Sequence, residues 1–392
     1  MKISFRKYFA ATLAACAATI AIASNAFALD YGGAFSNYTR IKGKNFSNLK
    51  LDQVNDLSGW IKYWIPGQEK MYVAAEALYE FEYDAAASKA FNRIDIDLLK
   101  FSGTWSVAQR PLTINAGRFV FSDYTGIIMN QNCDGIWANY KLPIMSVSAY
   151  MGYTGLLNAA FVKMQNHPKD AFKYKTDKAY QLAEKYFVTA AGVTVPNLFD
   201  RHCALGQFLA AFKLGGKSFN RVYITAGMNG PIWQSLYYNA TMTFGLQSFD
   251  GGSVGFTNLT KATVSYYFDF MDLTVNGGFV YASGDNGPFK AFYGFTKIDA
   301  YDALNEPQHT GVFKITAGAT IKPIKKVLAK LDTALIFDVM EKGKYKGFEW
   351  SVGADWQILS DAKVGASFLQ YIDSDNKDVN KVQLALNGTI TF

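Results

Sequence analysis

The sequence is poor in charged residues, cysteine and proline for its length. Charged side chains make up 18% of the 392 residues, and the chain has only three cysteines, three histidines and nine prolines. So few cysteines exclude a disulfide framework. An ordinary soluble domain carries about 25% charged residues. The low charge, together with 16% aromatic residues, therefore indicates another class of protein.

The N-terminus has the pattern of a secretory signal peptide. Residues 1–28 combine a basic start, an Ala-rich apolar stretch without acidic residues, and small residues at Ala26 and Ala28. This pattern predicts cleavage after Ala28 and a mature chain of residues 29–392. The alternative is a lipoprotein signal that keeps Cys16 as a lipidated N-terminus. The residues after Cys16 stay apolar, which favours the first interpretation.

The charge balance of the mature chain is mild. Cleavage removes Lys2, Arg6 and Lys7 and no acidic residue, so the formal charge falls from +7 to +4. This excess is too small to indicate a nucleic-acid partner.

Alternation with a period of two residues dominates the mature chain, and helical spacing is nearly absent. In residues 236–246, apolar and aromatic side chains occupy the even positions, while Tyr, Asn, Thr and Gly occupy the odd ones. Residues 261–270, 327–339 and 348–358 alternate in the same way. Strands of about 10 residues with one apolar face are long enough to cross an outer membrane at a tilt.

These strands predict an all-β protein, a transmembrane antiparallel β-barrel in the cell outer membrane. No apolar run of about 18 residues follows the signal peptide, and in lipid only helices and closed sheets satisfy every backbone polar group. A soluble β-solenoid or sandwich is the weaker alternative. The last strand ends at Phe392 and resembles the signal that outer-membrane barrels present to the barrel-assembly machinery. We therefore expect that machinery and outer-membrane lipids as partners.

Strand direction predicts an even number of strands. Seventeen candidates are visible, and a further strand must return between residues 154 and 200, where residues 185–195 alternate. We therefore predict about 18 strands, with 16 as the alternative. Tight turns at Met271-Asp272, Lys322-Pro323 and Leu359-Ser360 are expected on the periplasmic side. Long external loops are expected at 43–55, 122–133, 154–184, 248–260 and 284–308.

The polar positions of the strands predict a water-filled interior with both signs of charge, because a Lys or Arg facing mid-bilayer lipid costs on the order of 2–4 kcal/mol. The residues expected to line the pore are Glu76, Glu80, Arg93, Asp95, Asp97, Arg221, Asp269, Lys330, Asp332, Glu349 and Asp355. Lys100 has the parity of the lipid face, so either a bulge near Leu98-Leu99 or snorkelling to the interface must accommodate it.

Known catalytic and metal patterns are weak in this sequence. Gly251-Gly252-Ser253-Val254-Gly255 fits G-x-S-x-G, but a nucleophile elbow requires a helix after the serine, and a strand is expected there. His167, His202 and His309 have no metal-ligand spacing. We expect no enzyme activity, no catalytic residue, no metal and no cofactor, with a surface lipid hydrolase using His167 or His309 as a minor alternative.

Residues 116–143 suggest a family. The pattern Gly117-Arg118, then Asp123, Gly126, Asn130 and Asp134-Gly135 before an aromatic strand, resembles alginate-export and OprD-type porins over roughly 30 residues. The resemblance implies an eighteen-stranded passive channel for small anionic or sugar-like solutes, with a third loop that bends into the pore. Further charged residues share the inner parity: Lys62, Glu82, Lys261, Lys314, Asp338 and Lys363. With them, the expected acids are about as numerous as the bases, which departs from the basic interior of that family.

The same stretch predicts a constriction. Arg118 and Asp134 share the lipid parity, so we expect bulges at Gly117 and Gly135 to turn them inward. The site residues are then Arg118, Asp123, Asn130 and Asp134. One hypothesis is that they narrow the pore; the other is that an ion pair only anchors an inward loop. Ile127 and Ile128 are expected to pack against the barrel wall.

The predicted function is an outer-membrane porin for passive diffusion of small hydrophilic solutes. Two alternatives remain: a structural, antigen or adhesin barrel with a plugged lumen, and a transporter of hydrophobic solutes.

Overall fold

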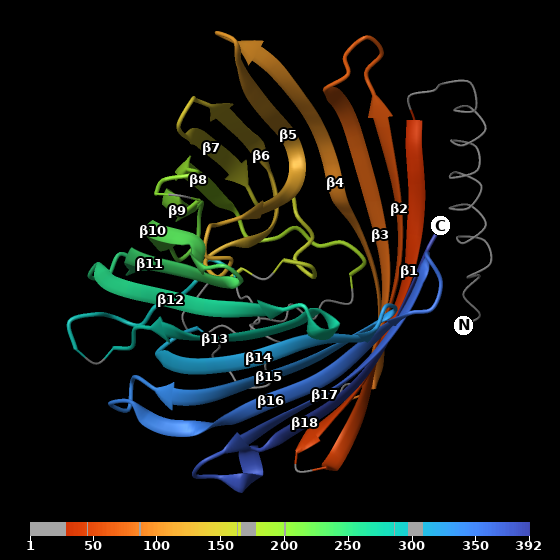
Figure 1. Cartoon of the computed structure of the whole chain (residues 1–392), viewed down its shortest axis with the longest axis vertical. Coiled ribbons are helices and arrows are strands. Elements are labelled where there is room, and N and C mark those ends of the chain that lie inside the picture. The colour runs from red at the N-terminus through yellow and green to blue at the C-terminus, as the bar shows by residue number, and fades with distance from the viewer. Residues whose placement is uncertain are drawn as a thin grey trace.

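The chain forms a closed barrel of eighteen antiparallel strands (Figure 1). The computed structural model describes residues 29–392 except 45, 86–87, 163, 166–177, 200, 286 and 297–308. The signal peptide and its cleavage site lie outside the described residues and stay predictions. The strands are β1 (Leu29–Lys44), β2 (Ser47–Trp64), β3 (Met71–Asp84), β4 (Lys89–Val107), β5 (Arg110–Ser122), β6 (Asn130–Lys141), β7 (Ser146–Tyr153), β8 (Tyr186–Val195), β9 (Cys203–Lys213), β10 (Phe219–Trp233), β11 (Leu236–Phe249), β12 (Gly255–Phe268), β13 (Leu273–Ala282), β14 (Val312–Ile324), β15 (Val327–Asp338), β16 (Lys344–Gln357), β17 (Ala362–Asp373) and β18 (Lys381–Thr391).

Each strand pairs with its neighbours in sequence, and β18 pairs with β1 to close the sheet. The count of eighteen is confirmed, and the returning strand predicted at 185–195 is β8. Two short 3-10 turns, η1 (Phe270–Asp272) and η2 (Lys377–Val379), are the helical elements of the described chain. Within this part of the chain, no helix is both long and apolar enough to cross a membrane.

The alternating parity of the sequence gives the barrel two chemically different faces. On β11, Met242 and Phe244 are 45% and 47% exposed on the outer face, whereas Thr241 and Thr243 are buried on the inner face. On β15, Leu331 and Leu335 are exposed and Ile336 is buried. An apolar outer face and a polar or covered inner face are what a barrel surrounded by lipid requires.

Two of the expected long loops are short. β1 and β2 pair without interruption from Leu29 and Tyr63 up to Lys42 and Lys50, so most of residues 43–55 belongs to strands. The Asp52 carboxylate on β2 forms ion pairs with Arg40 and Lys42 on β1, at distances of 3.3 and 2.5 Å. Polar cross-strand pairs stabilise a ladder beyond the apolar belt, so a polar sequence here forms strands and not a loop. Residues 248–260 are likewise mostly strand, with a short connection between β11 and β12.

A bulge accommodates Lys100. The register between β3 and β4 shifts so that Glu76 and Ala77 face Leu98 and Ile96, which leaves Asp97 as the extra residue. Ile94, Ile96 and Leu99 are therefore all on the outer face, and Lys100 lies inside, with its ammonium 5.4 Å from the Tyr72 ring. Of the two alternatives for Lys100, the structure shows the bulge, one residue before the expected position.

No bulge is present at Gly117 or Gly135. Gly117 pairs in register with Lys100 on β4 and with Gly135 on β6, and Gly135 pairs in register with Gly152. Gly117 instead has φ +112°, and a Cβ there would lie 2.0 Å from the Leu99 carbonyl oxygen. Glycine is needed for a close backbone approach and not for an extra residue.

The chain between β4 and β5 forms a fork. Below their shared turn the two strands pair only from Val107 and Arg110 to Leu99 and Arg118, and then separate, as Figure 1 shows. The remainder of β4, Lys89–Leu98, pairs only with β3 among the strands. The gap in the wall therefore begins at Arg118, one of the predicted site residues.

Candidate functional site

Three loops fold into the barrel and pack together. They connect β5 to β6, β7 to β8, and β13 to β14. Their apolar side chains form one buried cluster with residues of the inner wall: Ile127, Ile128, Met129, Leu157, Ala159, Met164, Ala183, Phe292 and Phe295. Ile128, Met129 and Phe295 are completely buried. The expectation that Ile127 and Ile128 pack inward is confirmed.

Asp123 organises the β5–β6 loop. Its carboxylate accepts hydrogen bonds from the backbone N–H groups of Thr125, Ile128 and Met129, and from the Thr125 hydroxyl. Burial raises the pKa of Asp123, while these four donors oppose the rise. Asp123 thus holds the fold of its own loop, and the hydrogen bonds of its carboxylate stay within that loop.

Backbone hydrogen bonds join the β5–β6 loop to the β13–β14 loop. The N–H groups of Phe295 and Thr296 both donate to the Ile128 carbonyl, at 2.7 and 2.9 Å, and the Asn130 N–H donates to the Thr296 hydroxyl at 2.9 Å. The contribution of Asn130 is its backbone, and its side chain is exposed. A constriction role for its side chain stays a prediction.

Arg221 fastens two of the loops to the wall. The side chain is completely buried, and its guanidinium donates to the Gly294 and Gln165 carbonyls at 2.8 and 2.9 Å. It also lies 4.1 Å from the Phe219 ring centroid. Arg221 faces inward as predicted, but it is covered by loops and has no exposed surface toward an open lumen. A buried guanidinium is favourable here because carbonyl groups and rings replace its water.

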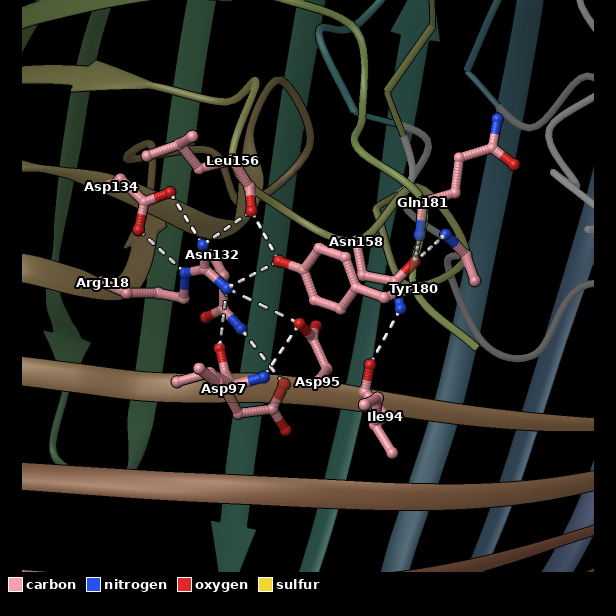
Figure 2. Close-up of polar contacts among 12 residues, drawn as sticks. Ile94, Asp95, Asp97, Arg118, Asn132, Asp134, Leu156, Asn158, Tyr180 and Gln181 are labelled. Atoms are coloured by element: carbon pink, nitrogen blue, oxygen red, sulfur yellow. Dashed lines mark hydrogen bonds and ion pairs between the residues drawn. The ribbon is translucent and has the colours of Figure 1, made fainter. Parts of the chain in front are cut away.

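Arg118 lies at the β4–β5 fork, where it joins three parts of the chain (Figure 2). Its Nε and one terminal nitrogen donate to the two oxygens of Asp134 at 2.8 and 3.0 Å. The guanidinium also donates to the Ile96 carbonyl on β4 at 3.1 Å, and to the Leu156 carbonyl and the Tyr180 hydroxyl of the β7–β8 loop at 2.9 and 3.4 Å. Asp95 lies 3.6 Å away. A bidentate pair of this kind is geometrically specific and strong.

The β7–β8 loop occupies the edge of β4 that β5 leaves unpaired. The Ile94 N–H donates to the Ala179 carbonyl at 3.1 Å, and the Asn158 side-chain amide donates to the Ile94 carbonyl at 2.9 Å. The Tyr180 hydroxyl donates to the Leu156 carbonyl at 2.5 Å. The loop thus satisfies backbone groups that a gap in the wall would leave bare, as the dashed lines of Figure 2 show.

Arg118 therefore holds the β7–β8 loop to the wall through the Leu156 carbonyl, whereas its ion pair with Asp134 joins the neighbouring wall strands β5 and β6. Arg118 is 7% exposed, and its partners are the wall and the β7–β8 loop. Asp123, the third member of the predicted constriction, bonds its own loop instead. Among the described residues, no hydrogen bond of Arg118 reaches the β5–β6 loop, so the anchoring of that loop and a role in narrowing the pore both stay predictions.

The inner wall of β2, β3 and β4 carries half of the predicted acidic pore residues, Glu76, Glu80, Asp95 and Asp97. Arg93 pairs with Glu80 and with Glu82, the latter at 2.6 Å. Asp56, Glu76 and Asp97 make no ion pair within the described part of the chain; Asp97 accepts only from Asn132, at 3.5 Å. This set of side chains on β2–β4, Asp56, Glu76, Glu80, Glu82, Arg93, Asp95 and Asp97, is called the charged wall below.

The remaining predicted pore residues belong to other parts of the barrel, from β10 to β16. Asp355 pairs with Lys330 and Lys363 at 3.1 and 3.3 Å. Asp332 is half-buried, and Glu349 is buried. Asp269 differs from the prediction: β12 ends at Phe268, so Asp269 precedes η1 in an exposed turn at the rim and is not on the inner wall. The roles of the other residues in lining a conduction path stay predictions.

The histidines and cysteines do not assemble into a reactive site. His167 lies outside the described residues. His202 Nδ1 is 2.9 Å from the Tyr238 hydroxyl, and His309 is buried. Cys133 and Cys203 are both free. In the described ranges no group of three or more His, Cys, Asp or Glu side chains is placed to hold a metal ion.

The sequence patterns do not predict the loop residues that complete this site. Leu156, Asn158, Tyr180 and Gln165 lie in a region that alternation marks only as a long connection. The β13–β14 loop offered one usable signal, because Phe289, Phe292, Tyr293 and Phe295 make it unusually aromatic for a loop in water.

Comparisons with known proteins support the fold. No protein-family model matches the sequence, and no curated protein matches it. Among solved structures, the BenF-like porin of Pseudomonas fluorescens Pf-5 is similar with a TM-score of 0.63 and 11% identity, over 93% of this chain and 98% of that one. Pseudomonas aeruginosa OccK5 (OpdH) is similar with a TM-score of 0.62 and 10% identity, over the same shares. P. aeruginosa OccK2 (OpdF), solved in complex with glucuronate, has a TM-score of 0.60 and 12% identity, again over 93% and 98%. The chain therefore has the fold of eighteen-stranded porins, as its resemblance to the OprD-type group predicted.

Proposed function

We propose that this protein is an outer-membrane porin that lets small hydrophilic solutes diffuse passively across the cell outer membrane. The observation that carries the proposal is a closed barrel with an apolar outer face and charged residues on its inner face, in a fold shared with porins. A closed antiparallel barrel leaves no unpaired edge toward lipid. The charged wall supplies a polar surface along which ions and solutes can pass.

The proposal includes orientation and partners. The rim that carries the termini and the short turns is the periplasmic side, and the long connections face outward. Phe392 is 74% exposed at the end of the closing strand, and its backbone exchanges two hydrogen bonds with Gly33 on β1. An exposed aromatic terminus supports the proposed recognition by the barrel-assembly machinery. Outer-membrane lipids cover the apolar face.

No step of the proposed function is catalytic. The segment Gly251–Gly255 leads from a loop directly into β12, so Ser253 is not on the strand-turn-helix support that a nucleophile elbow needs. Burial lowers the pKa of His309 to about 3, assisted by nearby Lys314 and Lys261. A histidine buried in this way has no access to a substrate at the lipid surface.

A plugged structural or adhesin barrel is the second candidate. The apolar cluster of three inward loops favours it, because packed loops occupy part of the interior. A transporter of hydrophobic solutes is less well supported, because residues 29–44 form a wall strand instead of a plug and β2–β4 carry charges inside.

Conductance distinguishes these functions. We expect discrete ion-conducting steps when the purified protein enters a planar bilayer, and swelling of liposomes in small sugars and organic acids. Detergent alone and the thermally unfolded protein are the controls. A folded barrel that inserts into the bilayer without conducting would contradict the porin function and support the plugged barrel.

A further inference from the structure

The inner wall of β5–β9 holds a cavity next to the β5–β6 loop. Its volume is about 390 Å³, within the roughly 300–1,000 Å³ of small-molecule pockets. Its lining consists of Phe121, Ser122, Tyr124, Trp137, Asn139, Ser146, Ser148, Ala149, Tyr150, Ala190, Gly192, Thr194 and Gln207. No charged side chain lines it. Asp134 and Lys141, the charged residues on either side along β6, are absent from the lining.

Flat aromatic surfaces form part of the lining. The Phe121 and Tyr150 rings are stacked, with centroids 4.1 Å apart and planes within 16°. Trp137 points inward on β6, between outward-facing neighbours such as Ile136. Aromatic faces of this kind pack well against apolar surfaces of a bound ring, and the axial C–H face of a pyranose is such a surface.

Tyr124 of the β5–β6 loop is fixed in place. Its N–H donates to Gln207 Oε1 at 3.0 Å, and its hydroxyl lies 3.0 Å from the Thr194 hydroxyl. Gly192 lies next to it: a Cβ there would come within 2.7 Å of the Tyr124 hydroxyl. The cavity is therefore preorganised, which lowers the entropic cost of binding.

Hydroxyl and amide groups complete the lining, and several have unused hydrogen-bonding capacity. Within the described part of the chain, the side chains of Asn139, Ser146 and Ser148 and the Nε2 of Gln207 make no hydrogen bond. Hydroxyls and amides both donate and accept. A ligand with many hydroxyl groups and one apolar face can satisfy them, whereas a carboxylate placed here would lose its water without gaining a cation.

We propose that this cavity is a binding subsite for neutral saccharides. The subsite selects uncharged sugar rings over the corresponding sugar acids, on the wall next to the one that is rich in carboxylates. This proposal rests on the proposed porin function, because the sugar reaches the subsite through the barrel interior, and it adds a class of solute to that function.

The test compares glucose with glucuronate, which has the same ring but carries a carboxylate. Calorimetry on the full mature protein in detergent measures binding, and planar-bilayer recordings measure interruptions of the ionic current by added sugar. We expect glucose to bind at least about tenfold more tightly than glucuronate, equivalent to about 1.4 kcal/mol. Equal or tighter binding of glucuronate would overturn the proposal.

Variants locate the binding. Trp137→Ala should weaken glucose binding about tenfold, and Trp137→Phe should restore most of it because a ring remains. Asn139→Ala is the second probe, since that side chain makes no hydrogen bond in the described structure and its loss leaves the fold intact. Trp356→Ala, on the outer face at 50% exposure, is the matched control and should change nothing. Equal glucose binding by all four variants would exclude this cavity as the site.

The two readouts separate the subsite from the channel function. A protein that conducts ions but neither binds glucose nor shows sugar-dependent interruptions would refute the subsite and leave the porin function standing. A protein that binds glucose through Trp137 without conducting would support the subsite and refute the channel. Loss of both would refute both.

Discussion

Two inner walls of the barrel obey the same alternation and have opposite chemistry. The charged wall on β2–β4 carries six acidic side chains and Arg93, and one of its ion pairs, between Arg93 and Glu82, is 2.6 Å long. The wall of β5–β9 presents aromatic rings, hydroxyls and amides around an uncharged cavity. Parity assigns a side chain to the inner face, but the neighbouring strands and loops decide whether water, a loop or a solute meets it.

The difference follows from where the loops pack. The three inward loops form an apolar cluster with inner residues of β5–β17, such as Tyr150, Tyr223 and Tyr371, and a wall that receives a loop must itself offer apolar surface. β2 and β3 contribute no residue to that cluster. Their inner side chains can therefore be charged, provided that water or a partner is available.

The largest expected effect is on the stability of the charged wall. Arg93→Ala leaves Glu80 and Glu82 close together without their shared cation, and breaking a buried pair in this way costs on the order of 3 kcal/mol. Urea unfolding of the barrel in lipid, followed by tryptophan fluorescence, measures the loss. Arg110→Ala, at the exposed end of β5, is the control. Equal stability of the two variants would show that the wall does not depend on this network.

A second expected effect is on the pH dependence of stability, and it comes from His309 in the part of the barrel that the inward loops cover. His309 is buried beside Lys314 and Lys261, and burial lowers its pKa to about 3. The unfolded chain takes up a proton near the ordinary pKa of 6.5, whereas the folded chain does not. Stability should therefore be constant above about pH 6.5 and fall by up to about 1.4 kcal/mol per pH unit between pH 6.5 and 3.

The comparison variant for this pH dependence is His309→Gln, which cannot titrate. Its stability, measured by urea unfolding at several pH values, should have a shallower slope than the wild type between pH 6.5 and 4. Parallel curves would mean that His309 is already accessible to protons in the folded state.

Alternation predicted the wall of the barrel well and its interior contents poorly. Eighteen strands and the inward parity of Glu80 and Arg93 follow from a period of two residues, because lipid penalises every misplaced charge. The same period shows that Lys100 breaks the pattern, but the choice between a bulge and snorkelling came from the structure. The interior loops obey no such period. Arg221 was assigned to the inner face correctly, but nothing in its strand shows that residues 165 and 294 would cover it.

The fork between β4 and β5 also lies beyond sequence reasoning. The parity of Arg118 conflicts with an inward position, and a bulge at Gly117 was the local solution. The structure uses a non-local one: β5 leaves the edge of β4, and Asn158 and Ala179 take its place. Contacts between residues so far apart in the chain leave no mark in a short sequence window.

A smaller effect concerns ion selectivity and tests whether solutes meet the charged wall. Replacing Asp56, Glu76 and Asp97 together, as Asp56→Asn, Glu76→Gln and Asp97→Asn, removes three carboxylates that have no ion pair in the described structure. The preference for cations over anions should fall about two- to threefold, because the wall then attracts fewer counter-ions. The reversal potential in a KCl gradient measures it.

The matched control for selectivity is Asp361→Asn, in the exposed turn between β16 and β17. It removes a carboxylate at the rim, far along the chain from the charged wall. A reversal potential that is the same for the triple variant and the control would mean that ions pass without contact with β2–β4.

The smallest expected change tests the role of Arg118, where the charged wall meets the uncharged one. Arg118→Ala removes both the charge and the hydrogen bonds that hold the β7–β8 loop, so single-channel conductance should rise, by less than about twofold, or selectivity should shift. Asn158→Ala releases the same loop from Ile94 without changing any charge. If both variants raise conductance equally, displacement of the loop explains the effect and Arg118 is an anchor. If only Arg118→Ala acts, its charge faces the conduction path and the constriction hypothesis holds. Unchanged conductance and selectivity in Arg118→Ala would rule out the constriction, since a side chain that narrows a pore cannot be removed without widening it.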